Sequence, residues 1–84
     1  MSTNVDTGLR YTQELLIRRR KELGLTLRDA SKLSGISVGG LSRLERGERT
    51  PTLRSLIALT ATYRLRLMVG DGQVYEMQDP RKAP

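Results

Sequence analysis

Cysteine and histidine are both absent from this chain of 84 residues. Their absence excludes a disulfide, a zinc site built on thiolate or imidazole ligands, and any Ser-His-Asp or Cys-His nucleophile. Metal chemistry would have to rest on carboxylates alone, and the acids and hydroxyls form no recognisable catalytic arrangement. We therefore expect no enzyme activity, no metal and no cofactor.

Aromatic residues are scarce, since Phe and Trp are missing and only three tyrosines are present. Hydrophobic residues make up 37% of the chain, so its core has to be built mainly from Leu, Ile, Val, Ala and Met. A chain of this length fits one domain and buries only about 60% of its unfolded surface. Because neither a disulfide nor a zinc site can add stability, oligomerisation is its natural source.

Negative charge is also in short supply, with nine Asp and Glu against fifteen Lys and Arg, a net charge of +6. Residues 10–66 hold thirteen basic and five acidic side chains, whereas residues 67–84 hold two and three. A basic segment indicates a polyanionic partner, nucleic acid first and an anionic membrane surface second. No apolar run approaches the roughly 20 residues of a membrane span and no secretory signal is visible, so we expect a cytoplasmic protein without a membrane partner.

Three helices between residues 12 and 47 are indicated by apolar residues at helical spacing, each helix ended by a glycine. The first follows a flexible lead-in over residues 1–8, and a hydroxyl residue caps the start of the second and of the third. Only a few residues separate these two helices, with a glycine among them, as a helix-turn-helix unit requires. The caps are Thr26 and Ser37, the glycines are Gly24, Gly35 and Gly47, and the expected core residues are Leu23, Leu25, Ala30, Leu33, Ile36, Leu41, Leu44, Leu56 and Leu59.

A fourth helix capped by Thr52, with Leu53, Leu56, Ile57 and Leu59 on its apolar face, is followed by strand-like alternation. Gly70-Asp71-Gly72 then gives a turn signal before a second strand. Because a lone two-stranded ribbon is marginal in water, we expect the strands to pair across a dimer, and residues 79–84 to form a flexible tail. The expected dimerisation residues are Leu65, Leu67, Val69, Val74 and Tyr75.

A motif spread over about 50 residues has the residue types and the spacing of one protein family. It consists of Arg20, Leu23-Gly24-Leu25-Thr26, Ala30, Leu33, Gly35-Ile36-Ser37, Leu41-Ser42-Arg43-Leu44-Glu45-Arg46-Gly47-Glu48-Arg49, Pro51-Thr52 and Leu56. At this spacing, residues 16–65 resemble the Xre/Cro-like helix-turn-helix family of phage repressors, bacterial regulators and antitoxins. The resemblance implies a mostly α fold, a lambda-repressor-like domain of four to five helices over residues 9–66. A short C-terminal β-strand or hairpin over residues 67–78 then serves dimerisation.

The resemblance also implies that the third helix enters the major groove of duplex DNA, with its first residues toward the base edges. Arg43 is the sharpest candidate, because a guanidinium can donate two parallel hydrogen bonds to guanine O6 and N7. The alternative for Arg43 is a phosphate or solvent contact. Val38 either contacts a thymine methyl or is half-buried in the first turn. The expected base-contacting residues are Ser37, Val38, Gly39, Ser42 and Arg43.

Phosphate contacts are expected from residues that flank the third helix, and for each of them the alternative is a solvated surface charge. Arg20 and Glu45 are instead implied to form a partly buried, structural ion pair between the first and third helices. Two positions depart from the family's pattern: Leu27 stands where Gln is usual, and Gly39-Gly40 lies inside the recognition helix. The expected backbone-contacting residues are Thr26, Arg28, Arg46, Arg49 and Thr50, with Arg18 and Arg19 as outlying candidates.

The function that these observations predict is a sequence-specific DNA-binding transcriptional regulator. It would act as a repressor, bind an inverted-repeat operator as a homodimer, and associate with the nucleoid when bound to DNA. A strand directly after the fourth helix is similar to the HipB-type antitoxins, which suggests an autoregulating antitoxin with a toxin partner. The alternatives are a phage Cro-type repressor, a restriction-modification controller protein, or a protein-binding module without specific DNA binding.

Overall fold

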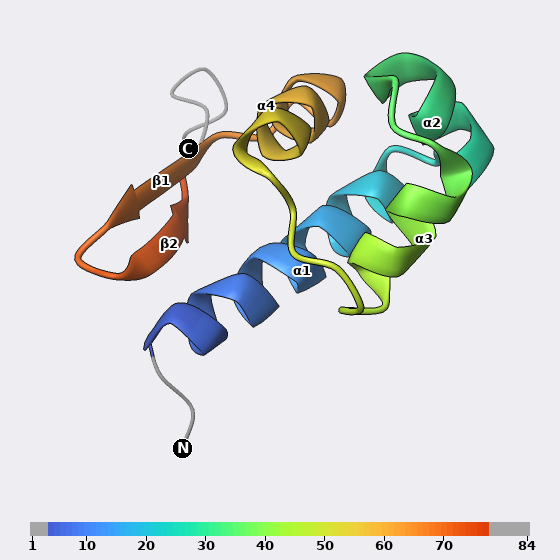
Figure 1. The fold of residues 1–84 in the computed structure, drawn as a ribbon. Helices are drawn as coiled ribbons and strands as arrows, with labels where there is room; N and C mark the ends of the chain where they lie inside the picture. Colours follow the sequence, from blue (N-terminus) through green and yellow to red (C-terminus); the bar gives the residue numbers. More distant parts are fainter. Residues whose placement is uncertain (1–3, 78–84) are drawn as a thin grey trace.

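Four helices and a β-hairpin make up the computed structural model, which describes residues 4–77 (Figure 1). The predicted fold class, a mostly α helix-turn-helix domain with a short C-terminal hairpin, is confirmed. The elements are α1 (Asn4–Glu22), α2 (Leu27–Ser34), α3 (Val38–Glu45), α4 (Leu53–Thr62), β1 (Leu67–Gly70) and β2 (Gln73–Glu76).

Hydroxyl side chains cap the starts of α2, α3 and α4, as the sequence predicts. Thr26, Ser37 and Thr52 each accept a hydrogen bond of 3.0 Å from the backbone N–H three residues further on. At α2 the cap is reciprocal, because the backbone N–H of Thr26 also donates to Oδ2 of Asp29 at 3.0 Å. Each cap satisfies a donor that the helix itself leaves unpaired, which sets the residue at which the helix begins.

α4 ends in the same type of turn as α1 and α3, but without a glycine. Gly24 and Gly47 follow α1 and α3 in the left-handed region, with φ of 72° and 74°. Arg64 takes this place after α4 with φ of 51°. Leu65 N–H then donates to Thr60 O at 2.9 Å and Arg64 N–H to Ala61 O at 3.4 Å, the paired bonds of a Schellman motif. An arginine therefore holds a backbone conformation that favours glycine.

α1 begins at Asn4, well before the helix expected from Thr12, so residues 4–8 are helical and are not a flexible lead-in. Packing against the hairpin explains the difference. Gly8 is buried, and a Cβ at this position would lie 3.4 Å from Cγ2 of Val74 and 3.8 Å from the carbonyl of Gly72. Helix propensity and periodicity within the first residues carry no trace of this contact, which joins the two ends of the described chain.

The core lies where the four helices meet, and Tyr63 is the only aromatic residue among its fully buried side chains in residues 4–77. Two predicted core residues are wrong, since Leu23 and Leu33 are 38% and 65% exposed. Leu53 and Ile57 also point outward from α4, because Leu56 and Leu59 occupy its inner face. The buried hydrophobic residues are Leu15, Leu16, Ala30, Leu41, Leu44, Leu59, Tyr63 and Leu65.

β1 and β2 pair with each other in an antiparallel hairpin within one chain. Asp71 and Gly72 connect them, with φ of 53° and 74°, which is the two-residue turn that matches the twist of a hairpin. The predicted turn is thus confirmed. Leu65 is 6% exposed in the core and cannot offer its side chain to a partner, so its assignment to dimerisation is corrected. The expected tail over residues 79–84 lies outside the described residues.

Candidate nucleic-acid interface

α3 buries one side and presents the other to solvent, directly after a tight turn from α2 (Figure 1). Gly35, with φ of 80°, ends α2, and the hydroxyl of Ser34 accepts a hydrogen bond of 3.2 Å from Ile36 N–H. Gly40, Leu41 and Leu44 form the buried side of α3. The short turn and this burial fix the direction of α3 and leave its opposite side available for contact.

The predicted base-contacting residues lie together at the start and on the outer side of α3. Ser37, Val38, Gly39 and Arg43 are exposed, and Ser42 is half-buried. Within residues 4–77 Arg43 forms no ion pair, so its guanidinium remains available to an incoming acceptor. Val38 is 42% exposed, which leaves its methyl groups free for an apolar contact.

The predicted backbone-contacting residues flank α3 on two sides. Thr26 and Arg28 stand at the start of α2, and Arg46, Arg49 and Thr50 follow α3; all five are exposed. Arg46 is held by Glu48 at 2.7 Å in an ion pair whose side chains are 59% and 54% exposed. This pair weakens the case for Arg46 as a phosphate contact, because Glu48 would have to be displaced. Arg28 and Arg49 have no such partner among the described residues.

The two glycines inside α3 differ in their surroundings. A Cβ at Gly39 would meet nothing within 4 Å, so this backbone lies bare at the surface. A Cβ at Gly40 would lie 3.1 Å from Oγ of Ser37, 3.3 Å from Cγ2 of Ile36 and 3.7 Å from Nη1 of Arg49. Gly40 therefore makes room for the N-cap and for the guanidinium of Arg49, whereas Gly39 leaves open space on the side that would face DNA.

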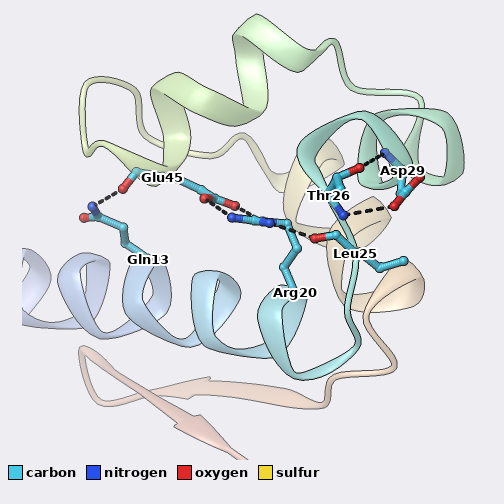
Figure 2. A network of polar contacts seen from close by, with 6 residues as sticks. All are labelled: Gln13, Arg20, Leu25, Thr26, Asp29 and Glu45. Carbon is cyan, nitrogen blue, oxygen red and sulfur yellow. Dashed lines mark hydrogen bonds and ion pairs between the residues drawn. The ribbon is translucent and has the colours of Figure 1, made fainter.

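Two side chains of α1, those of Gln13 and Arg20, donate hydrogen bonds to Glu45, the last residue of α3 (Figure 2). Arg20 donates to both carboxylate oxygens of Glu45, at 2.6 Å from Nε and 2.9 Å from Nη2, and its Nη1 donates to Leu25 O at 2.7 Å. Gln13 Nε2 donates to the backbone carbonyl of Glu45 at 2.6 Å. The hydrogen bonds with Glu45 raise the pKa of Arg20. This network fixes α3 against the longest helix and so holds the outer side of α3 in place.

Sequence reasoning identifies Arg20 and Glu45 but misses Gln13. A signal was available, because Gln13 lies seven residues before Arg20 and therefore on the same side of α1. Arg18 and Arg19 face elsewhere. Arg18 pairs with Glu76 of β2 at 3.0 Å, and Nε of Arg19 donates to Tyr63 O at 2.9 Å. These bonds tie α1 to the hairpin and to the end of α4, away from the outer side of α3.

Tyr63 closes the core beside this network. Its side chain is 1% exposed, and burial raises the pKa of its phenol, with Glu45 adding to the shift. A pocket of about 210 Å³ lies next to Tyr63. It is bounded by α1, by the end of α3 and by the segment after α3 that contains Arg49 and Thr50. Residues 4–77 hold no group of three or more Asp and Glu side chains placed to bind a metal ion.

The chain belongs to the Xre/Cro-like helix-turn-helix family, whose model, described as "Helix-turn-helix", matches residues 16–68. It is also similar to an HTH-type transcriptional regulator, DdrOP3, of Deinococcus deserti, with 46% identity over 50 residues. The match covers 60% of this chain and 39% of that protein, so the chain spans less than half of the relative's length. No solved structure matches. The family match and the similarity to this regulator both support DNA-binding transcription regulation.

No helix within residues 4–77 combines the length and apolar character needed to cross a membrane.

Proposed function

We propose that this chain is a sequence-specific DNA-binding transcriptional regulator that places α3 in the major groove. The observation that carries the proposal is the division of α3 into a buried side and an outer side. Leu41 and Leu44 anchor the helix, while Ser37, Val38 and Arg43 extend from the opposite surface. A helix of this width fits the major groove, where each base pair shows a distinct pattern of donors and acceptors.

Phosphate contacts come from the residues beside α3. Arg28 at the start of α2 and Arg49 after α3 would neutralise backbone charge on either side of the helix. The high positive charge of residues 10–66 supports this arrangement, since it attracts DNA before any base is read. Arg43 then supplies discrimination, preferentially at a guanine.

We further propose that the regulator is a repressor that binds an inverted repeat as a homodimer. A twofold-symmetric dimer places two recognition helices in successive major grooves about 34–36 Å apart. Occupying such a site over a promoter excludes polymerase without any added domain. The hairpin directly after α4 supports an autoregulating antitoxin as the second candidate, with a toxin as a further protein partner.

The experiment that tests DNA recognition is selection from a random duplex pool, followed by binding measurements over a salt series. Specific recognition predicts enrichment of one motif with twofold symmetry. Counterion release predicts a linear fall of log affinity with log salt concentration, with a slope of about −0.9 for each phosphate neutralised. No enriched motif together with a flat salt response would overturn the proposal and favour a protein-binding module.

A further inference from the structure

The pocket of about 210 Å³ beside Tyr63 leads from the surface to the hydrophobic core, where the segment between α3 and α4 passes α1 (Figure 1). Its floor is made of core side chains, and its rim carries polar and charged ones. An apolar cavity of roughly 150 Å³ is enough to bind benzene. This pocket therefore has room for one six-membered ring with small substituents. The floor residues are Leu16, Leu41, Leu44, Leu59 and Tyr63.

The phenol of Tyr63 is the polar group of this apolar floor. Its side chain is 1% exposed, and its hydroxyl forms no hydrogen bond within residues 4–77. Every side-chain N or O atom that is wholly buried in the same residues does have a partner. The hydroxyl of Tyr63 therefore keeps a small contact with solvent, and the pocket that Tyr63 lines supplies it. Such a hydroxyl can donate to, or accept from, a polar atom of a ligand.

The rim of the pocket carries an excess of positive charge. Arg10 on α1 and Arg49 in the segment after α3 both line it and are both exposed. Neither arginine forms an ion pair within the described chain. Of the two carboxylates that also line the pocket, Glu45 is already neutralised by Arg20, which leaves Asp6 against two arginines. This balance favours an anionic ligand, and a guanidinium suits a carboxylate because it can donate two parallel hydrogen bonds.

Arg49 connects the pocket to the start of α3. Its Nη1 lies 3.7 Å from the place that a Cβ on Gly40 would occupy, in the first turn of α3 and beside the Ser37 cap. The same arginine is one of the proposed phosphate contacts. A carboxylate in the pocket and a phosphate of DNA would therefore compete for one guanidinium, whose fork of donors serves one bidentate acceptor at a time.

We propose that this pocket binds a small aromatic carboxylate with a hydroxyl opposite the carboxylate, and that the ligand weakens binding to DNA. The ring lies on the apolar floor, the hydroxyl meets the phenol of Tyr63, and the carboxylate meets Arg10 and Arg49. A rigid ring suits the site better than a flexible chain, because it loses less conformational entropy on binding. Ligand binding depends on the fold alone, whereas its effect on DNA rests on the proposed function through Arg49.

The first test is an NMR chemical-shift titration of the full chain without DNA, with para-hydroxybenzoate as the probe. We expect shifts at pocket residues such as Gly47 and Thr50 and a dissociation constant of about 0.1–1 mM, as about ten non-hydrogen atoms allow. Benzoate lacks the hydroxyl and para-hydroxybenzyl alcohol lacks the carboxylate, so each should bind about tenfold more weakly. Acetate that binds as tightly as para-hydroxybenzoate, or no shifts at about 10 mM probe, would overturn the proposal.

Two variants test the polar ends of the site. Tyr63→Phe keeps the ring and removes the hydroxyl, so it should weaken para-hydroxybenzoate about tenfold and leave benzoate unchanged. A purely structural role of Tyr63 would change both affinities alike. Arg10→Gln should weaken both carboxylates, whereas Arg54→Gln, on α4 and outside the pocket lining, should weaken neither. Equal effects of the two arginine substitutions would reduce the carboxylate contact to general charge and overturn it.

A matched pair of leucines tests the location of the site. Leu9 lines the pocket and is 39% exposed, whereas Leu23 lies outside its lining and is 38% exposed. Leu9→Trp should fill the mouth of the pocket and abolish binding of para-hydroxybenzoate, and Leu23→Trp should bind it as the wild type does. Circular dichroism confirms that each variant is folded. A Leu9→Trp variant that is folded and binds the probe normally would place the site elsewhere.

The last test measures the effect of the ligand on DNA binding. Near-saturating para-hydroxybenzoate should lower affinity for the selected duplex about tenfold and reduce the salt slope by about 0.9, the share of one phosphate. Arg49→Ala should remove this sensitivity. Unchanged duplex affinity in the presence of bound ligand would overturn the effect on DNA. A chain that binds the probe but no duplex would contradict the proposed function while supporting the ligand site, because the titration without DNA decides the site by itself.

Discussion

Arg20 and Glu45 join α1 to the last residue of α3 through two parallel hydrogen bonds of 2.6 and 2.9 Å. Their side chains are 12% and 17% exposed, so the pair is largely shielded from water. Each charge depends on the other, because a charge left alone in such a place has lost its hydration without gaining a partner. The position of the proposed recognition helix is therefore tied to one ion pair.

Removing one member of this pair should destabilise the fold strongly. We expect Arg20→Ala or Glu45→Ala to lower the free energy of unfolding by about 3 kcal/mol, measured by urea denaturation. Arg46→Ala is the matched control, because its ion pair with Glu48 is more than half exposed and such pairs contribute about 0–1 kcal/mol. Equal losses in the buried and exposed pairs would contradict the structural role of Arg20 and Glu45.

Substitution by alanine should affect stability differently at the two glycines of α3, Gly39 and Gly40. At Gly39, Ala meets open space, so we expect a gain in stability of about 0.5–1 kcal/mol and a higher Tm. At Gly40 the added Cβ crowds Ser37 and Ile36, which offsets the gain in helix propensity. Because Gly39 lies on the proposed DNA side, Gly39→Ala should also weaken binding to the selected site. A variant that is more stable and binds DNA equally well would show that the bare backbone serves no close approach.

Replacing Arg64 with glycine should stabilise the fold. The left-handed backbone conformation costs an arginine about 1–2 kcal/mol, and glycine does not bear this cost. Part of the gain is offset, because glycine gives the unfolded chain more conformational freedom. We therefore expect Arg64→Gly to raise the free energy of unfolding by about 0.5–1 kcal/mol. Arg64→Ala removes the same side chain without relieving the backbone and should bring no such gain. Identical results for the two variants would assign the effect to the arginine side chain.

The cap of α2 should weaken in acid. Hydrogen bonds from the backbone and hydroxyl of Thr26 hold the pKa of Asp29 below its ordinary value. A lowered pKa in the folded state means that the stabilisation is present above the unfolded pKa of about 3.9 and disappears as pH falls through the folded value. The stability difference between wild type and Asp29→Ala should therefore be larger at neutral pH than in strong acid. A difference that does not change with pH would exclude a charged cap.

The starts of α2, α3 and α4 and the ends of α2 and α3 were predictable because single residues determine them. A threonine or serine hydroxyl pairs with the first free N–H groups, and Gly35 and Gly47 permit the turns that end α2 and α3. The Asp71-Gly72 turn was predictable for the same local reason. The ion pair of Arg20 with Glu45 came from the family resemblance, and the structure supplies its geometry.

What the sequence could not predict depends on contacts between distant segments. The first turns of α1 are helical because Gly8 meets Val74 across the fold, and no local pattern reports that. The two faces of the hairpin are both apolar, so alternation alone could not show which one packs on α1. Position 64, after α4, is an arginine and not the glycine that usually signals a left-handed residue at the end of a helix. The outer side of α3 was predicted as the DNA side, and its base contacts stay a prediction.

The central claim is that α3 reads base pairs, and Arg43 tests it most directly. The measurement is the binding free energy of Arg43→Ala and Arg49→Ala for the selected duplex and for random duplex DNA at fixed salt. We expect Arg43→Ala to lose about 1–3 kcal/mol on the selected duplex and little on random DNA, and Arg49→Ala to weaken both alike. Arg18→Ala, which removes a charge on the hairpin side of α1, should change neither appreciably. If Arg43→Ala instead weakens both duplexes equally, Arg43 contacts only the phosphates and α3 does not read sequence through it.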